Sequence, residues 1–123
     1  MQKDFNINKW ISAKKLTPLY KGLRLGMPVE LLHIMVNHNA YITYLTTTKR
    51  NAFHYAVRTG KIDLMTALLQ MLDTQIEDPK KKLAVIQQVD EDEEGGFTPL
   101  GYAQEMGDSK MVELIEHYVG QLQ

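Results

Sequence analysis

The four histidines are the side chains best suited to acid–base or metal chemistry near neutral pH. They are His33, His38, His54 and His117. The chain has no His-Glu-x-x-His motif and no cysteine, so the usual ligand spacings of a zinc site are missing. His33 and His38 stand five positions apart, which is a poor spacing for one helical face. We therefore expect no metal, no cofactor and no catalytic residue, and we interpret His54 as structural.

A run of five acids at residues 90–94 is the densest group of potential cation ligands. It does not follow the pattern of a Ca²⁺-binding loop, and Gly95-Gly96 lacks the Lys-Ser/Thr of a phosphate-binding loop. Because five neighbouring negative charges repel one another and resist burial, the run predicts an exposed loop. Loose binding of a cation is the alternative.

The basic residues of the first half could contact phosphate groups through salt-dependent electrostatic interactions. They include Lys14, Lys15, Lys49, Arg50, Arg58 and Lys61. Residues 1–61 contain ten Lys or Arg and two acids, a net charge of +8, whereas residues 62–123 contain four Lys and thirteen acids, a net charge of −9. The acidic second half and the few aromatic residues among the basic ones disfavour nucleic acid as the partner.

Three similar segments must position these side chains. Each has a turn-like start, a short apolar helix and a glycine nine residues after its first position, at residues 17–26, 51–60 and 98–107. A second apolar helical stretch follows each glycine, at residues 29–35, 62–69 and 111–115. The starts lie 34 and 47 residues apart, and periods of this size are typical of helical solenoids.

Local signals delimit the expected helices. Thr17-Pro18, Asn51 and Thr98-Pro99 are suited to begin the first helix of each segment. Asp78-Pro79 predicts an inserted helix over about residues 79–88, and Gly120 is expected to end the last helix.

Two further stretches complete the expected organisation. An apolar stripe of Leu31, Leu32, Met35 and Val36 is expected to face the core, and residues 8–15, with Trp10, are expected to form a short covering helix. Residues 40–48 alternate Tyr, Ile and Leu with Thr, which fits a strand, a hairpin arm or a continued helix.

The third segment resembles the ankyrin repeat in the run Gly96-Phe97-Thr98-Pro99-Leu100-Gly101-Tyr102-Ala103, with Gly107 and Met111-Val112-Glu113-Leu114-Ile115 beyond it. Residues 51–69 are similar, including His54 at the position of the motif histidine, and residues 17–35 match more loosely. Tyr20 and Gly101 replace that histidine elsewhere, so its hydrogen-bond bracing is expected only at His54.

The resemblance covers about residues 12–118 apart from an insertion, and it implies a fold. That fold is an all-α, ankyrin-like helical solenoid of three helix-turn-helix repeats, with an N-terminal covering helix and one inserted helix. The repeats would span about residues 12–45, 46–78 and 93–120, and the insertion about residues 79–92, within a single domain of residues 1–123.

The resemblance also implies a non-catalytic module that binds another protein through its concave face. The partner would contact the hairpin tips at Lys14, Leu16, Thr48, Arg50, Glu94 and Phe97, and the inner helices at Arg24, Leu25, Arg58, Thr59, Glu105 and Met106. Arg24, Arg58 and Glu105 occupy the same place in successive segments. The partner is therefore expected to present acid to the first two repeats and base or apolar surface to the third. For Phe97, packing on the adjacent hairpin is the alternative.

The sequence also allows expectations about cellular location and oligomeric state. No apolar run approaches the roughly 20 residues of a membrane span, and the first six residues lack the apolar core of a signal peptide. We expect a cytoplasmic, monomeric adaptor without membrane attachment. The alternatives are an interaction domain of a larger protein, such as a bacterial effector delivered into a host cell, or head-to-tail self-association between the basic and acidic ends. The charges could also serve solubility alone.

Overall fold

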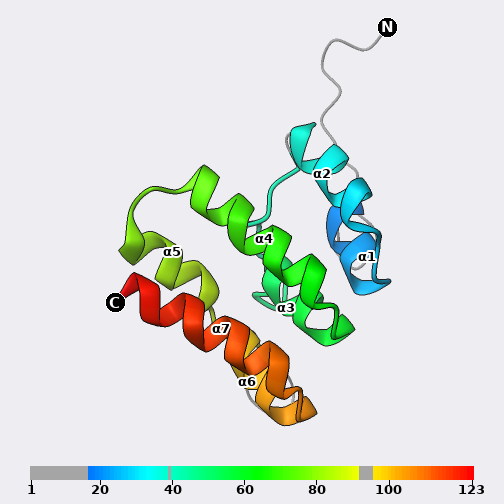
Figure 1. Cartoon of the computed structure of the whole chain (residues 1–123). Helices are drawn as coiled ribbons and strands as arrows, with labels where there is room; N and C mark the ends of the chain where they lie inside the picture. The colour runs from blue at the N-terminus through cyan, green and yellow to red at the C-terminus, as the bar shows by residue number, and fades with distance from the viewer. Residues whose placement is uncertain (1–16, 39, 92–95) are drawn as a thin grey trace, which may run out of the picture.

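The computed structural model describes residues 17–38, 40–91 and 96–123, and these residues form seven α-helices and no strand (Figure 1). The helices are α1 (Pro18–Arg24), α2 (Val29–Asn37), α3 (Ala52–Thr59), α4 (Ile62–Gln75), α5 (Pro79–Ile86), α6 (Pro99–Met106) and α7 (Ser109–Leu122). The all-α prediction is confirmed for this part of the chain. The predicted covering helix with Trp10, and the predicted contacts Lys14, Leu16 and Glu94, lie outside the described residues. No helix among the described residues is long and apolar enough to cross a membrane.

Side-chain caps and left-handed glycines define three helix–turn–helix pairs, α1–α2, α3–α4 and α6–α7. The Thr17 and Thr98 hydroxyls each accept a hydrogen bond from the backbone N–H three residues later, at 3.2 and 3.0 Å. Gly26, Gly60 and Gly107 have φ angles of 77°, 72° and 71°, a region that side chains other than glycine rarely adopt. These caps and turns agree with the sequence predictions.

The helices lie in two layers. Helices α1, α3 and α6 pack in sequence in one layer, and α2, α4 and α7 do so in the other (Figure 1). The core lies between the layers, where Phe53, Leu64 and Leu68 are fully buried. Ala56 and Ala103 are also fully buried, as expected for small residues where neighbouring helices cross closely.

The inserted helix α5 is confirmed, and it ends at Ile86 rather than near residue 88. Asp78 caps it by accepting a hydrogen bond from the Lys80 N–H at 2.9 Å. The Asp73 carboxylate of α4 joins α5 and α7: it lies 3.0 Å from Lys82 Nζ and accepts a hydrogen bond from the Tyr118 hydroxyl at 2.7 Å. The insertion is therefore tied to the second layer through α4 and α7.

Two local predictions were wrong. Leu31 is 43% exposed, because α2 packs mainly against α4 and only Leu32 of the stripe is fully covered. Helix α7 continues past Gly120 to Leu122. Glycine in a helix costs only about 1 kcal/mol relative to alanine, which need not end a helix by itself.

Residues 40–50 contain neither a helix nor a strand. They end in a tight turn, in which the Thr46 N–H donates to the Arg50 carbonyl at 3.0 Å and the Lys49 N–H donates to the Thr46 carbonyl at 2.9 Å. Lys49 has a left-handed φ of 62°. Of the three alternatives, the hairpin arm describes this loop best, although no strand ladder forms.

Candidate functional site

Four of the predicted contact residues line one open cleft of about 480 Å³. Arg24 comes from the end of α1, Thr48 and Arg50 from the loop before α3, and Arg58 from the last turn of α3. Thr46, Thr47 and Tyr55 complete the lining, and we call this space the arginine cleft. Guanidinium and hydroxyl groups donate hydrogen bonds, so the cleft is chemically suited to an anion.

Hydrogen bonds fix the loop at one wall of the cleft. The buried Thr46 hydroxyl accepts from the Arg50 N–H at 3.2 Å, and it lies 3.1 Å from the Thr48 hydroxyl. The Glu91 N–H donates to the Thr48 carbonyl at 2.7 Å. The loop is therefore held both by its own turn and by the segment that follows α5.

Tyr20 ties α1 to the same region. Its hydroxyl donates to the Tyr44 carbonyl at 2.5 Å, and its ring centroid lies 5.8 Å from that of Tyr44 and 5.5 Å from that of Tyr55. Burial raises the pKa of Tyr20 well above its ordinary value. The tyrosine that replaces the motif histidine in the first segment thus also hydrogen-bonds to a distant backbone carbonyl, through a different side chain from the histidine bracing expected at His54.

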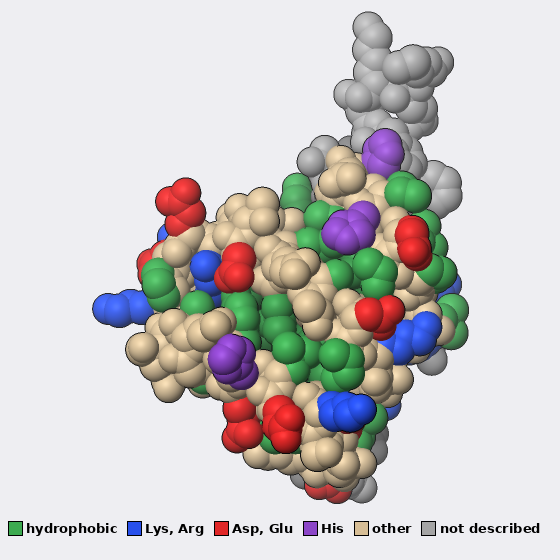
Figure 2. Space-filling model, viewed as in Figure 1, with side chains coloured by type: hydrophobic (Ala, Val, Ile, Leu, Met, Phe, Trp, Pro, Cys, Tyr) green, Lys and Arg blue, Asp and Glu red, His purple; other side chains and the backbone are tan. Residues whose placement is uncertain are grey.

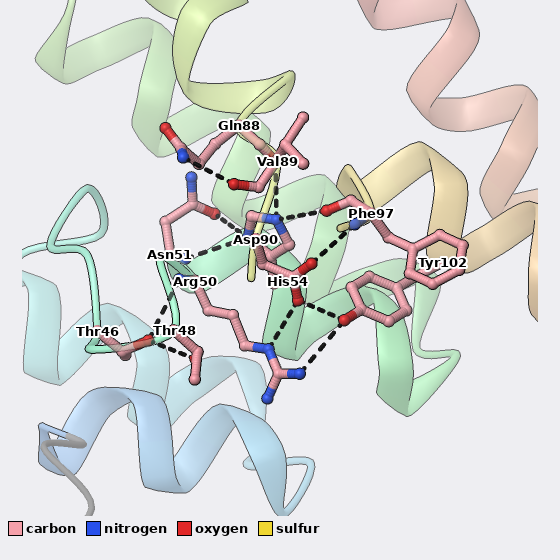
Figure 3. Close-up of polar contacts among 10 residues, drawn as sticks. All are labelled: Thr46, Thr48, Arg50, Asn51, His54, Gln88, Val89, Asp90, Phe97 and Tyr102. Atoms are coloured by element: carbon pink, nitrogen blue, oxygen red, sulfur yellow. Dashed lines mark hydrogen bonds and ion pairs between the residues drawn. The ribbon is translucent and has the colours of Figure 1, made fainter. Parts of the chain in front are cut away.

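His54 is buried at the start of α3 and completes a capping box with Asn51. Its Nδ1 accepts from the Asn51 N–H at 3.1 Å, while Nε2 lies 2.8 Å from the Gln88 carbonyl oxygen (Figure 3). Because a carbonyl only accepts, Nε2 carries the hydrogen and the ring is neutral. Burial lowers the pKa of His54. This geometry agrees with a structural histidine.

Asp90 corrects the prediction that the whole run at residues 90–94 is an exposed loop. Its side chain is 0% exposed and forms an ion pair with Arg50, whose Nε lies 2.8 Å from Oδ2 (Figure 3). The Tyr102 hydroxyl donates to the same oxygen, and the Phe97 N–H donates to Oδ1 at 2.8 Å. Three donors satisfy the carboxylate, so its burial is tolerated. Glu91 is exposed, and residues 92–94 lie outside the described part of the chain.

The environment of Asp90 also determines its ionisation. Burial by itself raises the pKa of a carboxyl group. The hydrogen bonds from Arg50, Phe97 and Tyr102 outweigh that effect, so the pKa of Asp90 lies below its ordinary value. The carboxylate therefore stays charged and neutralises one guanidinium of the arginine cleft.

The remaining predicted contacts are spread over the turns and α6. Leu25 is 78% exposed, Met106 is 47% exposed and Glu105 is exposed, as expected for contact positions. The Thr59 hydroxyl donates to the Ala56 carbonyl at 2.7 Å within the turn between α3 and α4. These residues do not line the arginine cleft.

Phe97 is half-buried, with its ring centroid 5.1 Å from that of Tyr102. It is therefore neither a fully exposed contact nor a residue packed only on the adjacent hairpin. Tyr102 also lies beneath Arg58, whose guanidinium carbon is 5.6 Å from the ring centroid. Sequence reasoning missed Tyr55 and Tyr102, although both stand four residues after a helix cap and the repeat register could have identified them.

The opposite layer carries a second, smaller groove. Its volume is about 320 Å³, and it is lined by His33, Val36, Asn37, Gln70, Met71, Thr74 and Gln75. Figure 2 shows hydrophobic side chains gathered between polar ones on this side of the molecule, over α4 and α7. The lining carries no fixed charge and does not indicate a ligand class. Within the described ranges, no group of three or more His, Cys, Asp or Glu side chains is arranged to hold a metal ion.

No protein-family model matches the chain, and no curated protein matches it. The residues and their geometry therefore have to carry any functional conclusion. The most distinctive geometry is the convergence of Arg24, Arg50 and Arg58 on one cleft that is rich in hydrogen-bond donors.

Proposed function

We propose that this chain is an ankyrin-like solenoid of three helix-turn-helix repeats that acts as a cytoplasmic adaptor. It would bind another protein, without catalysis, through the concave face that contains the arginine cleft. Three helix–turn–helix pairs in two layers support the solenoid, as do the left-handed glycine in each turn and the hairpin loop before α3.

The convergence of Arg24, Thr48, Arg50 and Arg58 on one cleft carries the functional proposal. Arg24 and Arg58 correspond to each other in the repeat register of the sequence. The four residues come from two helices and a loop, and because they line the same cleft, one ligand could contact all four side chains.

The charges of this face support a partner with an acidic segment. Arg24 and Arg58 are exposed, and neither has a carboxylate within ion-pair distance among the described residues. On the neighbouring α6, Glu105 and Met106 are exposed and would contact base or apolar surface. Complementary charges of this kind favour rapid and specific association.

The buried titratable groups favour binding over catalysis. His54 hydrogen-bonds to backbone groups through both ring nitrogens. Asp90 is saturated by Arg50, Tyr102 and the Phe97 N–H. These contacts hold the loops together and leave no proton-transfer group of this cluster directed at a substrate.

A charge-reversal experiment tests the proposal. A partner captured with the wild-type chain would be purified, and its Kd measured at two salt concentrations for wild type and for Arg24→Glu/Arg58→Glu. We expect at least a tenfold weaker Kd, about 1.4 kcal/mol, with a smaller difference at high salt. The matched control is Lys81→Glu/Lys110→Glu, which makes the same charge change on exposed residues of α5 and α7. Equal affinity of the wild type and the cleft variant would refute the proposed binding face.

A further inference from the structure

We propose that the arginine cleft binds the phosphate group of a phosphorylated residue on the partner protein. The inference rests on the proposed function and adds the chemistry of the recognised group.

The charge balance of the cleft matches a phosphomonoester. Three arginines line the space, and the guanidinium of Arg50 is paired with the Asp90 carboxylate at 2.8 Å. Arg24 and Arg58 thus contribute two positive charges that no carboxylate of the described residues offsets. A phosphorylated side chain carries about −1.5 to −2 at pH 7, whereas a Glu or Asp side chain carries only −1. A phosphate neutralises the cleft more completely than a carboxylate.

The hydroxyl groups of the loop add donors suited to phosphate oxygens. The Thr46 oxygen already accepts the Arg50 N–H, so the hydrogen of Thr46 can be donated to the Thr48 oxygen 3.1 Å away. The hydrogen of Thr48 is then available to a ligand. A phosphate has three strongly accepting oxygens and can use guanidinium and hydroxyl donors together.

Tyr102 holds two of the three arginines in place. The Arg58 guanidinium lies over its ring, and Arg50 Nη2 donates to its hydroxyl at 3.3 Å. Restricting these side chains before a ligand arrives lowers the entropy lost on binding. The cleft is therefore partly organised for an anion in the free protein.

The surroundings favour a single phosphate on a protein over a nucleic acid. Glu91 follows the buried Asp90 directly, its N–H bonds to the Thr48 carbonyl, and Glu105 is exposed on α6. A chain of phosphodiesters crossing this face would meet these acids. Exposed Leu25 and Met106 offer apolar contacts that a peptide can use. The cleft of about 480 Å³ is also larger than a phosphate group, so it has room for the side chain that carries one.

Titration of the full chain with small probes, followed by NMR, tests this inference. The probes are the N-acetyl, N-methylamide derivatives of phosphothreonine, phosphotyrosine and glutamate, together with a single-stranded oligothymidylate. At least one phosphate probe should shift the resonances of Arg24, Arg58 and residues 46–50, with a Kd at least tenfold lower than that of the glutamate probe. Equal or tighter binding of the glutamate probe or of the oligonucleotide at these residues would overturn the inference, as would shifts that avoid the cleft.

Two variants of the cleft and one control variant check the assignment of the residues. Arg24→Gln/Arg58→Gln should weaken binding of the phosphate probe at least tenfold, and Lys81→Gln/Lys110→Gln should leave it unchanged. Thr48→Val keeps every charge and should weaken binding about threefold or more through loss of one donor, within the range of a net hydrogen bond. Unchanged binding by the double Arg variant would contradict the assignment.

Phosphatase treatment of the captured partner separates this inference from the proposed function. If treatment abolishes binding that depends on Arg24 and Arg58, both stand. If the treated partner still binds in a manner that depends on these arginines, the phosphate inference fails and the proposed function stands. If binding never depends on them, the proposed function fails.

Discussion

Replacement of Asp90 by asparagine would show how much the buried ion pair contributes to stability. The carboxylate is 0% exposed and accepts from Arg50, the Phe97 N–H and the Tyr102 hydroxyl. Asparagine has a similar shape and can still accept the Phe97 N–H through its oxygen. Its amide group would then face Arg50 donor to donor, and the guanidinium would lose its counter-charge.

The expected loss in the free energy of unfolding is about 3 kcal/mol, since breaking a buried pair by changing one partner costs about 3–5 kcal/mol and one contact survives. Urea unfolding monitored by circular dichroism measures it. With a slope of about 1–3 kcal/mol/M, the midpoint should fall by roughly 1–3 M.

Glu91→Gln is the matched control, because it removes the adjacent, exposed acid. Its effect should stay within about 0.5 kcal/mol. A double-mutant cycle with Arg50→Gln should give a coupling energy between positions 50 and 90 of at least about 1.5 kcal/mol, as for a hydrogen bond to a charged group. If Asp90→Asn and Glu91→Gln were equally stable, the described ion pair between Asp90 and Arg50 would be wrong.

Three other predictions concern stability. The free energy of unfolding should fall as pH drops below about 6.5, by at most about 1.4 kcal/mol per pH unit. The reason is that the pKa of His54 is lower in the folded chain, so the unfolded chain binds more protons in this range. The lowered pKa of Asp90 predicts a further loss of unfolding free energy below about pH 4. Wild-type unfolding curves that superimpose at pH 7.5, 6 and 5 would contradict the prediction for His54. Gly107→Ala should destabilise the fold by about 1–2 kcal/mol from backbone strain alone, since φ is 71° and nothing lies within 4 Å of the added carbon; a melting temperature equal to wild type would argue against it. Tyr20→Phe should cost about 1–3 kcal/mol in urea unfolding by leaving the Tyr44 carbonyl without this donor, and a neutral result would show that another donor replaces it.

Features determined by neighbouring residues were predictable from the sequence. The caps at Thr17, Asn51 and Thr98 and the turns at Gly60 and Gly107 depend on side-chain and backbone chemistry within a few positions. The apolar spacing that buries α4 against the core is equally local. These signals account for the all-helical character and for most helix boundaries.

Features that depend on distant partners were not predictable. Nothing near Asp90 in the sequence distinguishes it from the four acids that follow, because its partner Arg50 lies 40 positions earlier. The exposure of Leu31 depends on which helices pack beside α2, and the helical spacing alone does not reveal this. Four of the predicted contacts line one cleft, because equivalent positions of neighbouring repeats lie close together in the fold. Tyr102 contacts Arg58 through the packing of α6 on α3, which the sequence does not reveal.

Tyr102 makes the N-terminal cleft depend on the integrity of the C-terminal helices. If α6 and α7 open together in a local unfolding event, Arg58 loses the ring beneath it and Arg50 loses a hydrogen-bond partner. Affinity at the cleft and local stability of this end of the chain are then thermodynamically linked. A bound ligand would slow amide hydrogen exchange in α6 and α7, because Tyr102 of α6 contacts two of the arginines that line the cleft.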